Sequence, residues 1–240
     1  MADLDLVQAT FNSENAGTED VVVSYSSNVT AGNTLICMVF SDDAMFATVS
    51  VSDDVNGSWT DGGEIDGTGT TNRAVNCFYF ANAAAGATQV TSTTTNNGTA
   101  APSLHIFEVE GNLAPVDPEG TANVTNTSSP SGQASTTTTA SSFRVGGFRV
   151  SAVGTPTMSD GGGGGSFTAN GDADSSRNAA FYLANDTTTG ALTVDCSGGF
   201  GSSDWSILQV AFEVSGAPAD TSMPPVNLLA NPKMRNLLNR

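Results

Sequence analysis

The sequence is poor in the residues that enzymes and nucleic-acid-binding proteins depend on. Among its 240 residues there are one histidine, one lysine and three cysteines. With His105 as the single histidine, a Ser-His-Asp or Cys-His catalytic arrangement would have to be built around that residue. The motifs G-x-S-x-G and G-x-x-x-x-G-K-[ST] do not occur either. The sequence therefore predicts a protein that is not an enzyme.

The cysteines and the apolar runs exclude two further classes. Cys37, Cys77 and Cys196 are odd in number and far apart, which fits neither a disulfide framework nor a zinc site. We expect them to be small buried side chains in strands. No apolar run approaches the ~20 residues of a membrane span. The start "MADLDLVQATF" lacks the regions of a signal peptide, so we expect no export signal.

Charge is distributed unevenly along the chain. Residues 1–220 contain 24 acidic and four basic side chains, a net charge of −20, whereas residues 221–240 contain three basic side chains and no acid. A strongly acidic body disfavours nucleic acid and anionic membranes as partners. It also suits a high-salt environment, where screening weakens self-repulsion, and so favours a halophilic source.

The acidic clusters do not form a regular calcium loop. "DVNGSWTDGGEI" (54–65) and "DADSSRNAAFYL" (172–183) both lack the glycine and the glutamate that an EF-hand loop needs at its sixth and twelfth positions. We therefore expect no cofactor. An irregular Ca²⁺ site among Asp53, Asp54, Asp61 and Glu64 is left open.

The pattern of apolar residues indicates strands. Short runs rich in Val, Phe, Ile and Thr are separated by clusters of Gly, Asn and Asp. This pattern predicts an all-β protein built of β-sandwiches, with immunoglobulin-like and jelly-roll topologies both open. We favour 121–142 as the polar first strands of a second sandwich over a linker. The other predicted strands are 21–26, 34–40, 47–52, 74–81, 88–93, 104–110, 142–152, 156–159, 178–184, 191–196 and 205–215.

An internal repeat divides the chain. "CFYFANAAAGATQVT" (77–91) resembles "AFYLANDTTTGALTVD" (180–195), "IFEVEG" (106–111) resembles "AFEVSG" (211–216), and Trp59 matches Phe167. The matches occur in one order at offsets of 103, 105 and 108 residues. They predict a duplicated unit of about 105 residues. The expected domains are 1–112, 113–216 and a C-terminal extension, 217–240.

The repeat also predicts the strand faces on which His105 and two glutamates lie. Matching Phe107 with Phe212 places His105 at the position of Val210, on a core-type face, so we expect a buried structural histidine. Glu108 and Glu213 then lie on the opposite face of their strands, which we predict to be solvated.

The C-terminal extension combines a Pro/Ser spacer, "GAPADTSMPP", with a basic, leucine-bearing end. A short helix could begin at Asn231 and Pro232. Alternatively, "NLLANPKM" resembles the opening strand of jelly-roll modules in phage tail proteins, which would pair along a sheet edge. In both cases we predict an anchor to a partner protein through Leu228, Leu229, Lys233, Met234, Arg235, Leu237 and Leu238.

The strand pattern as a whole resembles a known kind of unit. "GNTLICMVFSDD", "VSVSDDVNGSWT", "NRAVNCFYFANAAAGATQVT", "LHIFEVEG", "PVDPEGTA" and "DWSILQVAFEV" follow one another in this chain. This succession resembles a β-rich unit that recurs in tailed-phage virion proteins and bacterial surface proteins. The acidic, lysine-poor composition is similar to that of surface proteins of tailed viruses that infect halophiles.

The resemblance implies a virion structural protein on the exterior of the head, or on the tail. We expect a decoration, turret or cement subunit that forms a homo-oligomer and binds the major capsid protein or another virion protein. The alternative is a glycan- or receptor-binding adhesin or tail-fibre module. Its contacts to a host-surface glycan would come from Trp59 and from the loops 60–73 and 168–177.

Overall fold

The computed structural model describes residues 4–13, 20–41, 49–65, 74–94, 102–116, 121–127, 131–138, 141–150, 157–160, 166–170, 178–197 and 203–215. Every regular element in these ranges is a β-strand, and all strand pairs are antiparallel. The predicted all-β class is therefore confirmed.

Within the described ranges, nine strands come from the first half of the chain and nine from the second. Those of the first half are β1 (Leu6–Ser13), β2 (Asp20–Ser24), β3 (Thr34–Ser41), β4 (Val49–Asp53), β5 (Gly57–Ser58), β6 (Thr60–Ile65), β7 (Ala74–Phe80), β8 (Gln89–Thr94) and β9 (Ser103–Val109). Those of the second half are β10 (Leu113–Val116), β11 (Thr121–Thr127), β12 (Ser131–Thr138), β13 (Ser142–Val150), β14 (Thr157–Asp160), β15 (Thr168–Asn170), β16 (Asn178–Asp186), β17 (Gly190–Ser197) and β18 (Ser203–Val214).

The first half has the strand order of a jelly roll. Sheet A has the order β1-β9-β3-β7-β6, and sheet B has the order β2-β8-β4-β5. The pairs β1 with β9, β2 with β8, β3 with β7 and β4 with β5 are nested within one another along the chain. Such nested antiparallel pairs, divided between two sheets, form a jelly roll and not an immunoglobulin-like sandwich. The topology that the sequence left open is thus determined.

The second half repeats this order. Sheet C has the order β10-β18-β13-β16-β15, with β11 also paired to β18, and sheet D has the order β12-β17-β14. Again β11 pairs with β18, β12 with β17 and β13 with β16. Residues 121–142 therefore contain strands β11 and β12, as favoured from the sequence. The predicted boundary after residue 112 falls between β9 and β10.

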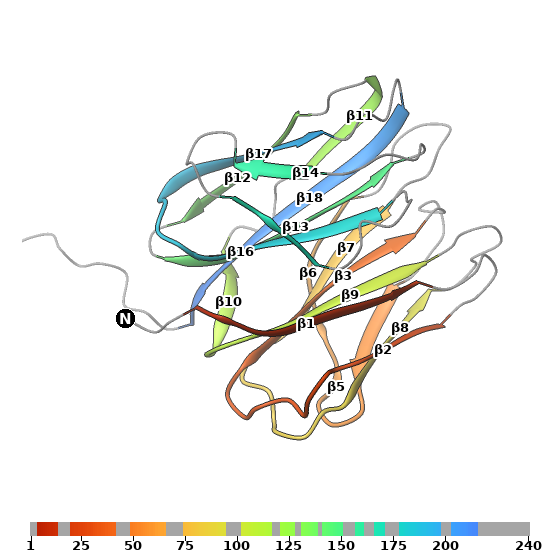
Figure 1. The fold of residues 1–240 in the computed structure, drawn as a ribbon, viewed down its shortest axis with the longest axis vertical. Helices are drawn as coiled ribbons and strands as arrows, with labels where there is room; N and C mark the ends of the chain where they lie inside the picture. The colour runs from red at the N-terminus through yellow and green to blue at the C-terminus, as the bar shows by residue number, and fades with distance from the viewer. Residues whose placement is uncertain are drawn as a thin grey trace, which may run out of the picture.

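The four sheets are stacked in the order B, A, C, D, and the layers run from the bottom to the top of Figure 1. One hydrophobic cluster lies between B and A and includes Val21, Leu35 and Trp59. Another lies between C and D and includes Phe148 and Phe181. The largest lies between A and C. The sequence predicted two sandwiches in tandem but did not predict this third core, which joins them.

The central core is built from both halves of the chain. It contains Ile36, Met38 and Phe40 of β3 together with Val145 of β13 and Phe212 of β18. Sheets A and C are therefore covered on both faces, and every residue of β9 and β13 is buried. Strands covered on both faces read as continuous apolar runs, whereas β2, which is covered on one face only, alternates buried and exposed residues.

Two adjacent glycines let β13 sit close to its neighbours. A Cβ atom on Gly147 would lie 2.6 Å from Cζ of Phe40 in sheet A. A Cβ atom on Gly146, which faces the other way, would lie 2.6 Å from Sδ of Met158 in sheet D. No side chain can occupy either space while its neighbour stays in place. The sequence "VGG" in β13 thus sets the spacing of three of the four layers.

Candidate functional site

The predicted anchor lies outside the described residues. This applies to Leu228, Leu229, Lys233, Met234, Arg235, Leu237 and Leu238, and to the whole extension after residue 216. The described chain ends at Ser215, whose backbone N–H donates to the carbonyl of Asn112. The extension therefore starts beside the link between the two halves, and its role stays a prediction.

The acids considered for calcium have separate structural roles. Asp53 ends strand β4 and accepts hydrogen bonds from the backbone N–H groups of Val55 and Asn56, whereas Asp54 accepts bonds from the backbone and hydroxyl of Thr88. Asp61 accepts a bond from the backbone N–H of Gly63. Across the described ranges, no group of three or more His, Cys, Asp or Glu side chains is placed to hold a metal ion. The structure does not bring together the four acids of the open Ca²⁺ hypothesis.

Trp59 is part of the core and not of an exposed binding loop. Its side chain is buried between sheets A and B, and its indole Nε1–H donates to Oδ2 of Asp53 at 2.8 Å. The expectation that Trp59 contacts a glycan is therefore wrong. Neighbouring Gly, Asp and Asn residues suggest an exposed turn, but Trp59 lies between β5 and β6, where its side chain enters the core between sheets A and B.

Substituting Trp59 with phenylalanine is expected to lower the free energy of unfolding by about 1–3 kcal/mol, since Asp53 loses a buried donor. Denaturant titration at neutral pH measures the loss. The matched control is Asp54→Asn, because Asp54 is exposed and its carboxylate accepts bonds from Thr88 and Gln89 and none from the indole. A Trp59→Phe chain as stable as the original would show that the indole hydrogen bond contributes nothing.

Glu108 contradicts the prediction of a solvated face. Its side chain is fully buried in β9, and its carboxylate accepts hydrogen bonds from Gln8, from the backbone N–H of Thr30 and from the amide of Asn33. Glu108 does lie on the face of the strand opposite Phe107, as alternation predicts. That face is covered by sheet B and the loop after β2, so the carboxylate is held by hydrogen bonds instead of water.

His105 is buried, as predicted. Its ring stacks on Phe11 with centroids 5.0 Å apart and meets the edge of Phe40. Nδ1 lies 3.1 Å from the carbonyl oxygen of Asn170, so Nδ1 carries the proton and donates. Burial lowers the pKa of His105 to about 4, against the smaller opposing effect of the bond to Asn170. The single histidine therefore connects β9 of the first half to β15 of the second.

The lowered pKa of His105 predicts how stability depends on pH. Between the ordinary value of 6.5 and about 4, the unfolded chain binds a proton that the folded chain does not. Stability should therefore fall as pH drops from 7 to 4, by about 3 kcal/mol from this group. The check is the unfolding free energy at several pH values for the original chain and for His105→Gln. The His105→Gln chain should show the weaker dependence, and equal slopes would contradict the assignment.

The two described cysteine side chains are also structural. Cys37 and Cys77 are fully buried free thiols on β3 and β7, as predicted. Burial raises the pKa of both thiols, which keeps them in the unreactive protonated form. Cys196 lies in β17, in a range where the structure describes the backbone only.

A buried charged cluster in the second half was not predicted. Arg144 on β13 is fully buried; its Nη1 donates to Asp186 at 2.8 Å and lies 3.4 Å from Asp160. Its Nε donates to the side-chain oxygen of Gln209, and its guanidinium lies 5.0 Å from the ring centre of Phe167. Burial would raise the pKa of Asp186, but hydrogen bonds from Thr188 and Arg144 outweigh this effect and lower it.

The cluster occupies the place of the Trp59–Asp53 pair in the other half. The hairpin pair Ser52–Ser58 corresponds to the bridge Ser159–Ser166, so Asp160 corresponds to Asp53 and Phe167 to Trp59. Phenylalanine has no N–H to offer an aspartate. Arg144 brings a positive charge to Asp160 instead, with Nη1 3.4 Å from Oδ2, and covers the phenylalanine ring. A comparison of the two repeats could have suggested this exchange, because an arginine within "FRVGGFRV" needs a buried partner.

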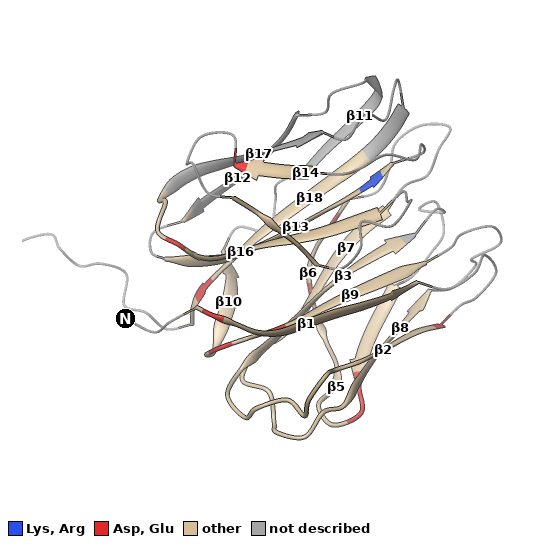
Figure 2. Cartoon of the chain, viewed as in Figure 1, with Lys and Arg blue, Asp and Glu red and all other residues tan. Residues whose placement is uncertain are grey.

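The described acidic residues lie mainly at strand ends and in turns, as Figure 2 shows. In the described part of the chain no helix is long and apolar enough to cross a membrane. No protein-family model matches the sequence, and no curated protein matches it. What the chain does must therefore be argued from its own residues.

Proposed function

We propose that this chain is a non-enzymatic structural subunit on the exterior of a tailed virus, of the decoration, turret or cement kind. One observation carries the proposal. The side chains that could do chemistry in the described body, among them His105, Cys37, Cys77 and Glu108, are buried and serve the packing and hydrogen bonding of the fold. A four-layer β body with such an interior is suited to a structural role.

The sequence supports the viral setting of this proposal. The succession of strand and turn motifs resembles a unit of tailed-phage virion proteins, and jelly rolls are common in viral capsid proteins. The net charge of −17 keeps the surface soluble and suits high ionic strength, as around a virus of a halophile. These points are analogies of fold and composition.

The attachment is assigned to the C-terminal extension. Its basic residues Lys233, Arg235 and Arg240 oppose the charge of the body, and four leucines offer apolar contacts. An acidic neighbouring surface, on the major capsid protein or on another subunit of a homo-oligomer, would be attracted to such a segment.

A truncation separates the body from the anchor. A chain ending at Gly216 is expected to keep the circular-dichroism spectrum and unfolding midpoint of the full chain but to lose co-sedimentation with capsids depleted of the protein. The matched full-length control, Lys233→Gln with Arg235→Gln, should weaken binding and its salt dependence without abolishing the apolar part. Undiminished binding by the truncated chain would refute the anchor.

A further inference from the structure

The contact between sheets A and C is made twice, with the two halves of the chain exchanging roles. Tyr79 of the first half packs edge-on against Phe212 of the second, with ring centroids 5.8 Å apart and planes at 66°. Tyr182 of the second half packs edge-on against Phe107 of the first, at 6.1 Å and 64°. The two contacts agree in partners, distance and angle.

The two tyrosines occupy equivalent places in their sheets. Thr60 of the edge strand β6 lies opposite Tyr79 of β7, and Thr168 of the edge strand β15 lies opposite Tyr182 of β16. Both tyrosines pack against the central core, whereas the preceding phenylalanine in each strand faces the outer sheet.

The two phenylalanines are equivalent by the same test. Phe107 of β9 lies opposite Ile36 of β3, and Phe212 of β18 lies opposite Phe143 of β13. All four side chains are fully buried members of the central core. The equivalence follows from strand order and register alone.

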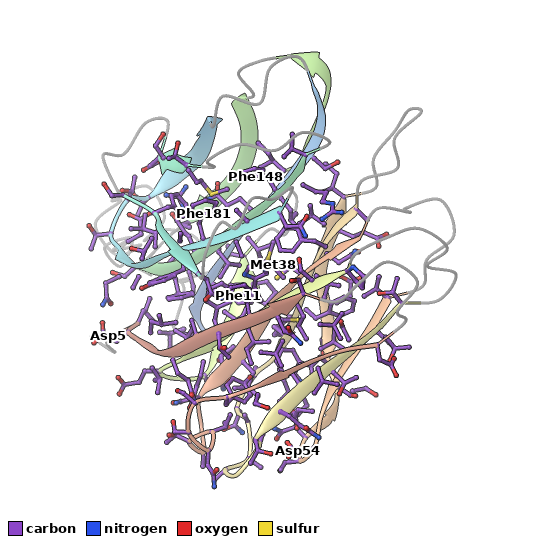
Figure 3. The ribbon with its side chains drawn as sticks, turned by 45° about the vertical axis from the view of Figure 1, so that its right-hand side comes forward. Asp5, Phe11, Met38, Asp54, Phe148 and Phe181 are labelled. Atoms are coloured by element: carbon purple, nitrogen blue, oxygen red, sulfur yellow. The ribbon has the colours of Figure 1, made fainter. Side chains whose placement is uncertain are left out.

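An interface in which residue i meets residue j, and j meets i, is the isologous interface of a two-fold dimer. We infer that sheets A and C form such an interface inside one chain, so that each half is a binding surface whose partner is the other half. The chain is a fused dimer of two jelly rolls. In Figure 3, Met38 and Phe11 lie at this junction, whereas Phe148 and Phe181 lie within the upper half.

At its centre the interface departs from exact two-fold symmetry, because a large residue of the first half faces a glycine of the second. In the registers just given, Phe40 is four residues beyond Ile36 and Gly147 is four residues beyond Phe143, so the two positions correspond. The ring of Phe40 fills the space that Gly147 leaves. Two first halves would oppose phenylalanine to phenylalanine, and two second halves would leave a void. The pairing of unlike halves is therefore favoured.

Hydrogen bonds across the interface also require unlike halves. The side-chain amide of Asn170 on β15 donates to the backbone carbonyls of Thr10 and Ile106, and the backbone carbonyl of Asn170 accepts from Nδ1 of His105. At the position of His105 the second half has Val210, which can donate nothing. Leu4 is buried in the central core, with its backbone N–H bonded to Asn185. These bonds fix the register between the halves.

The test cuts the folded chain between its halves. A protease recognition sequence is inserted between Gly111 and Asn112, the chain is folded and then cleaved, and light scattering during size-exclusion chromatography measures the mass. The cleaved chain is expected to keep the mass of the uncleaved chain, 24.3 kDa plus the insertion, and native mass spectrometry should show one of each half. Separated halves, or pairs of like halves, would overturn the inference. The uncleaved chain is the control for the insertion.

Two neighbouring glycines provide matched variants for the cleaved chain. Gly147→Ala should weaken the association of the halves at least 10-fold, because its methyl group meets Phe40 across the interface. Gly146→Ala adds the same methyl group on the opposite face, towards Met158, and should leave the association within 3-fold of the original. Equal weakening by both variants would show that the junction is not the A–C face.

Discussion

Replacing Arg144 with methionine is expected to destabilise the chain by about 3–5 kcal/mol, the loss typical of a buried ion pair that has lost one partner. Arg144 is fully buried, and it pairs with Asp186 and Asp160. Without the guanidinium, both buried carboxylates lose their positive partner, although Asp186 keeps the hydrogen bond from the backbone N–H of Thr188. Equilibrium unfolding in denaturant at neutral pH measures the effect.

Two further variants separate loss of charge from loss of shape. Arg144→Lys keeps the charge but not the planar set of donors, so we expect it to recover part of the stability. Arg144→Met combined with Asp160→Asn and Asp186→Asn removes the unpaired charges, and should be more stable than Arg144→Met alone. A loss below about 1 kcal/mol for Arg144→Met would contradict the structural role of the cluster.

Truncating Phe40 to alanine is the second large effect that we expect, about 3–5 kcal/mol, because it opens a cavity in the core shared by the two halves. Phe40 is fully buried, touches the ring of His105 and fills the space above Gly147. Thermal and denaturant unfolding, followed by circular dichroism, measure the loss.

A second substitution tests the shape of that cavity. Gly147→Ala should destabilise the original chain but should be much less destabilising in the Phe40→Ala chain, where only the flexible end of Met38 remains close to the added methyl group. Val22→Ala on the exposed face of sheet B is the matched surface control, with an expected change within about 0.5 kcal/mol. Additive effects of the Phe40 and Gly147 substitutions would show that the two residues do not meet.

Much of the fold could be predicted from the sequence because alternation and turn chemistry are local. The strand runs around Val39, Phe78 and Phe107 were found within two residues of their observed bounds. Strands with weak apolar patterns, such as β1 and β10, were missed. Their positions are set by pairing with β9 and β18, which are about 100 residues away along the chain. A local sequence pattern does not report such pairing.

The sequence does not predict that sheets A and C are packed against another sheet on both faces. Alternation shows that Glu108 and Phe107 lie on opposite faces, but not that each face meets another sheet. Burial of Arg144 was missed for the same reason. The offset between the repeats did identify Trp59 and Phe167 as equivalent, and the structure adds that Asp53 accepts a hydrogen bond from the indole whereas Asp160 forms an ion pair with Arg144. The anchor residues, such as Leu237 and Arg235, lie outside the described chain and stay a prediction.

The most direct test of the proposed function is a mass-spectrometric analysis of purified virions from the virus or host that encodes the chain. The account predicts that the protein is present at a fixed ratio to the major capsid protein and that high salt combined with a mild detergent releases it from intact particles. Absence of the chain from particles that are otherwise complete would contradict the account.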